Sequence, residues 1–501
     1  MVAILFIFSV GIASIPIFSY QFLSINDYLN HLARSNVLLR YHDDPTFTRF
    51  FVPNWQPLPN LAFDLWILVT GQVIPVEIAG KLFVALTLAL LLSGVIFLHR
   101  VAFGKWSLWP FLALILLYNR PLLAGVLNFL FGVALWLHVL SLWIYLRAER
   151  AVIRTLVLSV ASLVIFFAHL FAFGILAVTI AVYELVIFGS DKRPWHRRVG
   201  DLIIGAIPFI PALAILVLLS PHSSASGIVR YREVWSRLAA FAAPVLYNWR
   251  MDAIGYLILL TLFAWAVGKR AVHFNRPLVA GAIALFVLQF FMPNVIMTAE
   301  SADHRIPIAM MLLAIGATDP NMASRGRRLC FILAVEAIFL FRIATIEARW
   351  ALDQPIYADA RAGLSSIPAG ARVATAFPRN IFDDSSAPAV ALYYIPVWDV
   401  VSHGGFTQTL FALPTQHPLV FRSKYVALAA ATPANALWRA FVIGDDEVSL
   451  PQPNPEIVMA LRSYDYVVFL DRRKFTVRDA FPLLPFYNGQ YVRIYRISTI
   501  P

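Results

Sequence analysis

The chain has 501 residues, of which 60% are hydrophobic and 14% charged, and its mean hydropathy is +0.73. These values lie outside the range of ordinary soluble domains and predict a protein embedded in lipid. A net charge of +12 would suit a nucleic-acid partner, but Lys and Arg occur in small groups between apolar runs, so no nucleic-acid partner is expected. The single cysteine, Cys330, excludes a disulfide within the chain and a cysteine-based metal site.

Apolar runs predict the crossings, because spanning about 30 Å of hydrocarbon takes roughly 20 helical residues. The first run, Val2 to Leu23, lacks a basic leader and a cleavage-like segment, so it is interpreted as a retained helix and not as a signal peptide. We predict an α-helical polytopic membrane protein with about eleven transmembrane helices. The candidate crossings are 2–23, 76–98, 104–118, 122–146, 155–170, 172–188, 201–220, 253–268, 277–297, 306–318 and 329–346.

The stretch from Thr155 to Gly189 is too long for one crossing, because roughly 35 residues of helix would measure about 50 Å. Basic groups lie on both sides of it, at 147–154 and 192–198. If both groups stay on the cytoplasmic side, the chain must cross twice. The turn is then expected near His169 and Gly174.

Loop charge also predicts the orientation. With the N-terminus inside, five short loops hold fifteen Lys and Arg residues, whereas the longer connections on the opposite side hold nine. An odd number of crossings then places the C-terminal tail outside. We therefore predict a membrane region over 1–346, with a first outside loop over about 24–76, and an outside domain over 347–501.

The tail alternates between two sequence patterns. Its β-rich segments alternate with helix-like segments, a pattern typical of a small α/β domain. No catalytic motif occurs in it, and its acidic groups Asp383-Asp384 and Asp445-Asp446-Glu447 suit surface turns better than a cation site. The expected strands are 371–377, 464–470 and 490–496, and the expected helices are near 388–395 and 454–462.

The most informative segment follows the first crossing. On a helix, Asp27, Asn30, His31 and Arg34 fall within an arc of about 100°, which presents a polar stripe just outside the membrane. A carboxylate at this place can accept a proton from an attacking hydroxyl, with His31 orienting it. The alternative is a solvated helix face with an Asp–His or Asp–Arg pair. A metal site with His42 and the two acids that follow it is a further alternative, but that spacing is not diagnostic.

A second polar group lies near the outer end of the ninth crossing, at Glu300 and Asp303-His304-Arg305. An arginine at this depth can hold a phosphate, because its planar guanidinium makes paired, charge-assisted hydrogen bonds. The alternative is an interfacial anchor or a local Asp303–Arg305 pair. His169, at the proposed turn, could face the same site or could be a structural residue beside phenylalanines.

Three segments together resemble the GT-C superfamily of polytopic glycosyltransferases, similar to bacterial protein mannosyltransferases and aminoarabinose transferases. They are Asp27-Tyr-Leu-Asn-His-Leu-Ala-Arg34, Gly125-Val-Leu-Asn-Phe-Leu-Phe-Gly132 and Asp303-His-Arg-Ile-Pro307. The resemblance implies an enzyme of the bacterial inner membrane with a periplasmic tail. The enzyme would move a sugar, with inversion, from a polyprenyl-phosphate donor to an extracytoplasmic acceptor such as a glycan, lipid or protein.

By this resemblance Asp27 acts on the acceptor nucleophile and Arg305 holds the donor phosphate. We assign His31 to catalysis beside Asp27, His304 and His169 to the donor phosphate, and Asn30, Arg34 and Asp303 to substrate binding. No cofactor is expected, and no metal ligand is assigned. The chain departs from the family in lacking an Asp-Glu pair in the first loop, in carrying Arg120 where an acid is usual, and in having only Trp398-Asp399 as a tail motif. These departures leave metal dependence and acceptor class open.

Two other classes fit the composition. A transporter or flippase for a lipid-linked or amphipathic solute would have acids or broken helices near the bilayer midplane and inverted repeats. No clear repeat occurs, and the acids and bases inside the runs are few: Glu77, Lys81, Glu184 and Glu336. A non-catalytic scaffold would disperse its polar groups instead of gathering them at one place.

Overall fold

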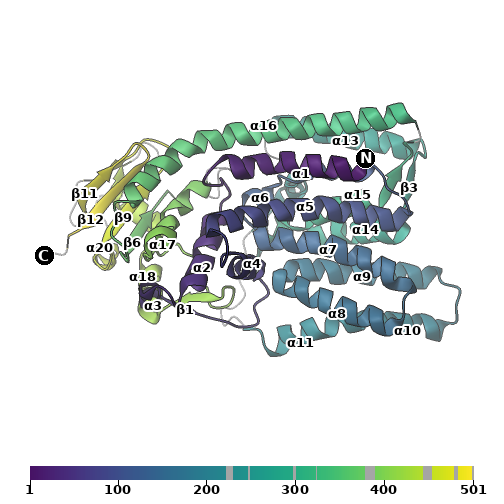
Figure 1. The fold of residues 1–501 in the computed structure, drawn as a ribbon, viewed down its shortest axis with the longest axis horizontal. Helices are drawn as coiled ribbons and strands as arrows, with labels where there is room; N and C mark the ends of the chain where they lie inside the picture. The colour runs from purple at the N-terminus through teal and green to yellow at the C-terminus, as the bar shows by residue number, and fades with distance from the viewer. Residues whose placement is uncertain are drawn as a thin grey trace.

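The computed structural model describes residues 1–221, 229–245, 249–296, 301–322, 324–378, 390–443, 454–478 and 483–498. Helices dominate the described residues (Figure 1). The acidic groups of the tail and Glu300, which the sequence analysis considered, lie outside these ranges.

Within the described ranges, seven helical segments are long and apolar enough to cross a membrane, which is the architecture of a multi-pass helical membrane protein. Their outward side chains are largely apolar, as contact with lipid requires. The segments are α1 (Val2–Ser19), α5 (Val76–Phe103), α7 (Leu127–Tyr145), α8 (Ala151–Ala168), α9 (Leu170–Ser190), the run Trp195–Leu218 and α16 (Arg325–Leu364). Within Trp195–Leu218 lie α10 (Trp195–Ala206), η3 (Ile207–Phe209) and α11 (Ile210–Leu218).

The other four candidate crossings are also helical but mostly shorter. The eleven residues of α15 extend only about 17 Å, well short of the hydrocarbon thickness. Eleven crossings therefore stays a prediction. These helices are η1 (Trp109–Leu116) with α6 (Arg120–Leu123), α13 (Trp249–Gly268), α14 (Arg276–Phe291) and α15 (Ile306–Gly316).

The predicted break in the long apolar stretch is confirmed at His169. α8 ends at Ala168 and α9 begins at Leu170, with His169 in an extended conformation between them. The His169 Nδ1 atom accepts a hydrogen bond from the Phe171 backbone N–H at 3.1 Å, so the imidazole caps the start of α9. Gly174, the other suggested turn position, lies inside α9.

The two ends of the bundle differ in what they hold (Figure 1). The N-terminus, the start of α10 and β3 (Val272–Phe274) lie at the end far from the C-terminus, and β3 pairs there with β5 (Thr318–Pro320). The tail occupies the opposite end. α16 runs along the whole bundle and enters the tail, and its 40 residues include the predicted domain boundary at 346/347.

The tail contains a four-stranded sheet in the order β11-β12-β9-β6, in which only the β6–β9 pair is parallel. The strand predictions for 371–377, 464–470 and 490–496 are confirmed by β6, β9 and β12, and the helix near 454–462 by α20. The strands are β6 (Val373–Ala376), β9 (Tyr466–Leu470), β11 (Leu483–Asn488) and β12 (Val492–Ile497). The helices are η7 (Val390–Val397), α17 (Trp398–His403), α18 (Ser423–Ala431), α19 (Ala434–Phe441) and α20 (Pro455–Leu461), and β8 (Val442–Ile443) pairs with β10 (Thr476–Val477).

The first polar segment and the tail form one packed unit. β1 (Phe51–Pro53) pairs antiparallel with β7 (Leu419–Phe421), and the Arg422 side chain donates to the Thr48 carbonyl at 2.6 Å. A shared core of buried side chains joins α2 to the sheet. The two segments therefore lie on the same side of the bundle. The first segment comprises α2 (Tyr28–Arg40), α3 (Pro45–Phe50), β1 and α4 (Ala62–Thr70).

A third segment completes this end of the molecule. β2 (Val229–Arg230) pairs with β4 (Val295–Ile296), which brings the chain after α11 against the chain before α15. Trp235, on the short helix that follows, is 78% exposed, as expected for a helix at the level of the head groups. The remaining elements are α12 (Val234–Ala239), η4 (Ala240–Ala242) and η5 (Ala302–His304).

Candidate functional site

The polar face of α2 is buried and not solvated. Asn30 and Arg34 are 0% exposed and His31 is 6% exposed, because the tail and α4 cover the helix. Asp27, which precedes the helix, stays partly exposed. The expectation of a stripe open to solvent is therefore wrong for these three residues. A solvated helix face does not explain them either.

Arg34 forms a buried ion pair with Asp64 of α4. Its Nε and Nη2 atoms donate to the two carboxylate oxygens at 2.9 and 2.7 Å, and both side chains are 0% exposed. The Ser35 hydroxyl donates to the same carboxylate at 2.7 Å. Such paired geometry offsets the cost of removing both charges from water. The pair holds α2 against α4.

His31 is a neutral imidazole that links this ion pair to a neighbouring turn. Arg34 Nη2 lies 3.1 Å from His31 Nδ1, and since a guanidinium can only donate, Nδ1 is the acceptor and Nε2 carries the proton. Burial and the Arg34 charge hold the pKa of His31 well below its usual value, and a hydrogen bond with the Gly125 backbone acts in the opposite direction. The ring can orient its neighbours, whereas its low pKa makes it a poor proton acceptor.

Gly125 brings this turn into direct contact with Asp27. Its φ is +83°, a left-handed conformation that favours glycine, and a Cβ atom added there would lie 2.8 Å from the Asp27 Cβ. The Asn26 N–H donates to the Leu123 carbonyl at 3.0 Å beside it. Asp27 is therefore positioned by a turn that begins the predicted Gly125–Gly132 motif.

Arg305 lies at the start of α15 and is 8% exposed. Its Nη1 atom is 3.4 Å from His169 Nε2, and its guanidinium lies over the rings of Phe129 and Phe171 at 5.9 and 5.0 Å. Burial lowers the pKa of Arg305 to about 10, while the nearby Asp27 carboxylate acts to raise it, so the group is charged at neutral pH. The structure thus brings Asp27 and Arg305 into electrostatic contact.

His169 joins the α2 residues to Arg305. Burial, then the charge of Arg305 and then His31, hold the pKa of His169 well below its usual value. Its Nδ1 accepts the capping hydrogen bond from the Phe171 N–H, so the neutral ring carries its proton on Nε2, and that nitrogen lies against Arg305 Nη1 at 3.4 Å as a contact and not as a hydrogen bond. The structure shows the capping role of His169 and places its ring beside Arg305, and its role toward a phosphate stays a prediction.

Asp303 and His304 lie beside two further arginines. Arg232 Nε is 3.8 Å from Asp303 Oδ2, and Arg232 Nη1 is 3.4 Å from His304 Nε2. Burial and the charges of Arg120 and Arg232 lower the pKa of His304 to about 3. Burial raises the pKa of Asp303, with Arg232 as the largest opposing influence. A local pair between Asp303 and Arg305 is not what the structure shows.

The tail covers the site. The Phe411 N–H donates to Asn30 Oδ1 at 2.9 Å, and the Phe411 ring stands edge-on to the His31 ring at 6.2 Å. His417 stacks on Phe411 at 5.6 Å and is itself buried, and its pKa is lowered by burial and by the nearby Arg34 and His31. The segment around Phe411 therefore packs against the polar face of α2 and covers it.

The metal alternative gains no support from the geometry. Asp44 accepts a hydrogen bond from the Thr46 N–H and so caps α3, while His42 and Asp43 are exposed. Within the described ranges, no three His, Cys, Asp or Glu side chains gather as a metal ion would require.

Of the predicted residues, Asp27, His31, His169 and Arg305 form one group, and Asp303 and His304 belong to a second group beside it. Sequence reasoning missed the partners that complete both groups. Arg120 entered the sequence analysis only as a departure from the family, and Arg232 was not among the predicted site residues. Asp64 and His417 were not predicted, because no motif or spacing in their local sequence distinguishes them from other acids and histidines.

Comparison of the chain with known proteins finds no matching family model, no matching curated protein and no matching solved structure.

Proposed function

We propose that this chain is an integral-membrane glycosyltransferase that moves a sugar from a polyprenyl-phosphate donor to an extracytoplasmic acceptor, with inversion. The observation that carries the proposal is that Asp27 and Arg305, two residues from distant loops, converge at one end of an apolar bundle: the Asp27 carboxylate acts on the charge of Arg305, and His169 lies 3.4 Å from Arg305. An acid and a buried cation are the two groups that this chemistry needs.

Asp27 would act on the acceptor. Its carboxylate takes the proton of an acceptor hydroxyl as the oxygen attacks the anomeric carbon of the donor sugar. The new carbon–oxygen bond forms while the bond from the anomeric carbon to the phosphate oxygen breaks, and the polyprenyl phosphate leaves with that bonding pair. Partial exposure of Asp27, amid neighbours that are buried, leaves its carboxylate reachable by an acceptor.

Arg305 would hold the leaving phosphate. Its guanidinium stays charged at neutral pH and is set between His169 and two phenylalanine rings, so its position does not depend on the substrate. A preorganised cation in a poorly solvated site stabilises the charge that develops on the leaving group. This arrangement needs no nucleotide-binding loop, because the donor is lipid-linked and carries its own anchor.

The remaining residues would position these two. His31 and the Arg34–Asp64 pair fix α2 and the Gly125 turn against which Asp27 lies. Asn30 fixes the covering segment of the tail through Phe411. The basic loops at the far end of the bundle favour a cytoplasmic N-terminus, which would place the site and the tail on the periplasmic face of a bacterial inner membrane.

The test compares Asp27→Asn with Asp43→Asn, an acid-to-amide change at an exposed position of the same segment. Both are expressed in cells that lack the chromosomal copy, and lipid-linked sugars and surface glycans are compared with those of the wild type. Asp27→Asn should lower transfer by about 100-fold or more at normal protein abundance, whereas Asp43→Asn should leave it unchanged. Full transfer by a folded Asp27→Asn protein would contradict the mechanism.

Arg305→Lys provides the second arm, with Arg40→Lys at an exposed site as its control. Lysine keeps the charge but loses the planar, two-pronged geometry, so the binding of a polyprenyl phosphate should weaken while the fold is kept. If neither change alters glycans but a lipid-linked sugar accumulates on one leaflet, the chain is a flippase and not a transferase.

A further inference from the structure

The second group of charged residues lies next to Arg305, because Asp303 and His304 directly precede Arg305 in the chain. It contains two guanidinium groups and one carboxylate. The Arg120 N–H donates to the Ala243 carbonyl at 3.1 Å, so the turn that carries Arg120 lies against the segment that carries Arg232. Asp303, on η5, is the acid within reach of both.

Asp303 compensates these charges only weakly. Its carboxylate is 0% exposed, and neither oxygen accepts a hydrogen bond of ordinary geometry from the described residues. The nearest guanidinium atom, Arg232 Nε, is 3.8 Å from Oδ2, beyond hydrogen-bonding distance. A buried carboxylate with so loose a partner leaves an excess of positive charge at this place.

Arg342, a neighbouring arginine, provides a comparison, because its guanidinium has both a carboxylate and a carbonyl as hydrogen-bond acceptors. Arg342 of α16 reaches the same corner, where it donates to the Val245 carbonyl at 2.5 Å and to Asp252 at 2.7 Å. By contrast, burial and repulsion from Arg232 lower the pKa of Arg120. Two like charges are therefore held together next to a site already proposed to take a phosphate, and Arg232 is still 34% exposed.

We propose that Arg120 and Arg232 form a binding site for a phosphate group, separate from the phosphate assigned to Arg305. His304 supports the site, because its neutral ring accepts from Arg232 and adds no charge of its own. Two arginines suit the several oxygens of a phosphate through paired hydrogen bonds. The site itself stands on this geometry. Its assignment to a second phosphate rests on the proposed function and narrows the donor class there to a polyprenyl diphosphate sugar, from which the polyprenyl diphosphate leaves. The head group of an anionic phospholipid is the other source of the same chemistry.

The experiment measures binding by the purified full-length protein in nanodiscs. The probes are a polyprenyl monophosphate, a polyprenyl diphosphate and phosphatidylglycerol, and the variants are Arg232→Gln and Arg120→Gln. Arg230→Gln is the control, because Arg230 is exposed and, among the described residues, it is its backbone that is engaged, in the β2–β4 pair. Folding is checked by gel filtration and thermal unfolding. Arg232→Gln is the leading variant, because the Arg232 side chain is 34% exposed and its replacement is tolerated more easily by the fold.

Arg232→Gln should weaken diphosphate binding about tenfold and leave monophosphate binding unchanged, while Arg230→Gln alters neither. A tenfold loss confined to phosphatidylglycerol would support the site with a phospholipid as the source. Unchanged binding of all three probes by both folded variants, or an equal loss with Arg230→Gln, would overturn it. Asp27→Asn separates the two proposals, because it should lower transfer in cells by about 100-fold or more and yet keep diphosphate binding in this assay.

Discussion

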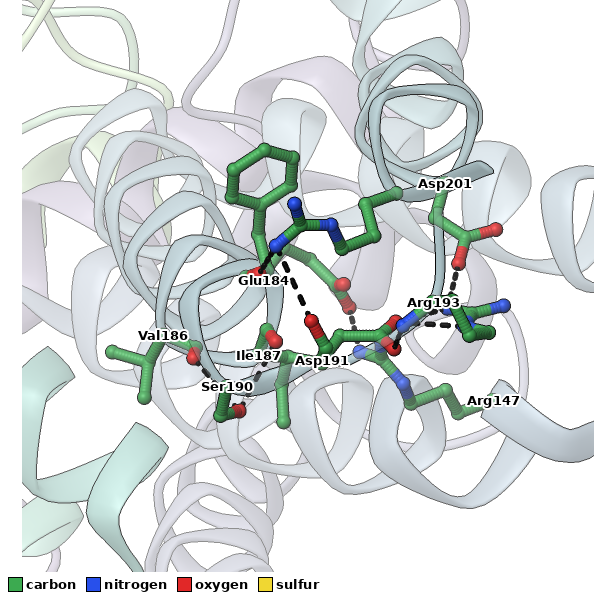
Figure 2. A network of polar contacts seen from close by, with 10 residues as sticks. Arg147, Glu184, Val186, Ile187, Ser190, Asp191, Arg193 and Asp201 are labelled. Atoms are coloured by element: carbon green, nitrogen blue, oxygen red, sulfur yellow. Dashed lines mark hydrogen bonds and ion pairs between the residues drawn. The ribbon is translucent and has the colours of Figure 1, made fainter. Parts of the chain in front are cut away.

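The two ends of the helical bundle treat charge in opposite ways. At the end that holds the N-terminus, Arg147 lies 2.6 Å from Glu184, and Arg193 lies between Asp191 and Asp201 at 2.6 and 2.5 Å (Figure 2). These groups line a shallow, solvent-open hollow, and Arg193 is 49% exposed. Glu184 is buried beneath Arg147, whereas the pairs of Arg193 are exposed, and exposed pairs are worth little to stability and act mainly on topology.

At the end that holds the tail, several charged groups are buried. Arg34 has a full partner in Asp64, Arg305 is 8% exposed, and the buried Asp303 has Arg232 3.8 Å away. Removing a charge from water is costly, so a buried carboxylate with so distant a partner as that of Asp303 persists mainly where it binds or reacts. The contrast is the physical reason for placing the chemistry at this end.

The largest effect on stability is expected from breaking the buried pair. Arg34→Met leaves the Asp64 carboxylate buried and uncompensated, which should cost about 3–5 kcal/mol. Thermal unfolding in detergent measures this directly. Arg193→Met, at the exposed end, is the matched control and should not shift the unfolding midpoint measurably. Equal shifts of the unfolding midpoint in Arg34→Met and Arg193→Met would show that the ion pairs at the two ends contribute equally to stability, which would contradict the comparison.

A smaller effect is expected at the turn beside Asp27. Gly125→Ala adds a Cβ against the Asp27 backbone and strains a left-handed residue, which costs roughly 1–2 kcal/mol by itself. Gly104→Ala is the control, because Gly104 has φ +71° but open space around it. Displacement of Asp27 should lower transfer by about 100-fold in Gly125→Ala and leave it near wild type in Gly104→Ala. Equal activity of the two variants would mean that the turn does not position Asp27.

A further predicted effect concerns pH. The folded pKa of His304 is about 3, below the usual 6.5, so its contribution to stability is complete above pH 6.5. As pH falls from 6.5 toward 3, the unfolded chain takes up a proton that the folded chain excludes, and stability is lost at up to about 1.4 kcal/mol per pH unit. His304→Gln should reduce the slope of stability against pH over this window. An unchanged slope would show that this ring is not held neutral.

Local sequence predicted much of this fold. Runs of apolar residues identified the long helices, and basic groups on both sides of 155–189 predicted the break at His169. Alternating β-branched and aromatic residues located three strands of the tail sheet. The end of α16 was harder to predict, because charges after residue 346 are typical of a loop outside the membrane. Residues such as Ala and Leu nevertheless continue the helix to Leu364.

The candidate site was only partly predictable. The spacing of Asp27 and His31 and the depth of Arg305 gave useful signals, and the structure brings these residues together. Helical periodicity shows that the polar residues of α2 share one face, but it does not show whether water or protein covers that face. In the structure, Phe411 and Asp64 from distant segments cover it. Arg120 and Arg232 meet Asp303 through tertiary packing alone, which no local pattern reports.

The central claim is that the candidate site and the tail share one face of the membrane and the basic loops lie on the other. Single cysteines at positions 43, 423 and 192, all exposed, can be placed in a Cys330→Ser background and treated with an impermeant maleimide in spheroplasts. Positions 43 and 423 should react before permeabilisation, and position 192 only after it. Labelling of 43 and 192 from the same side would contradict the account.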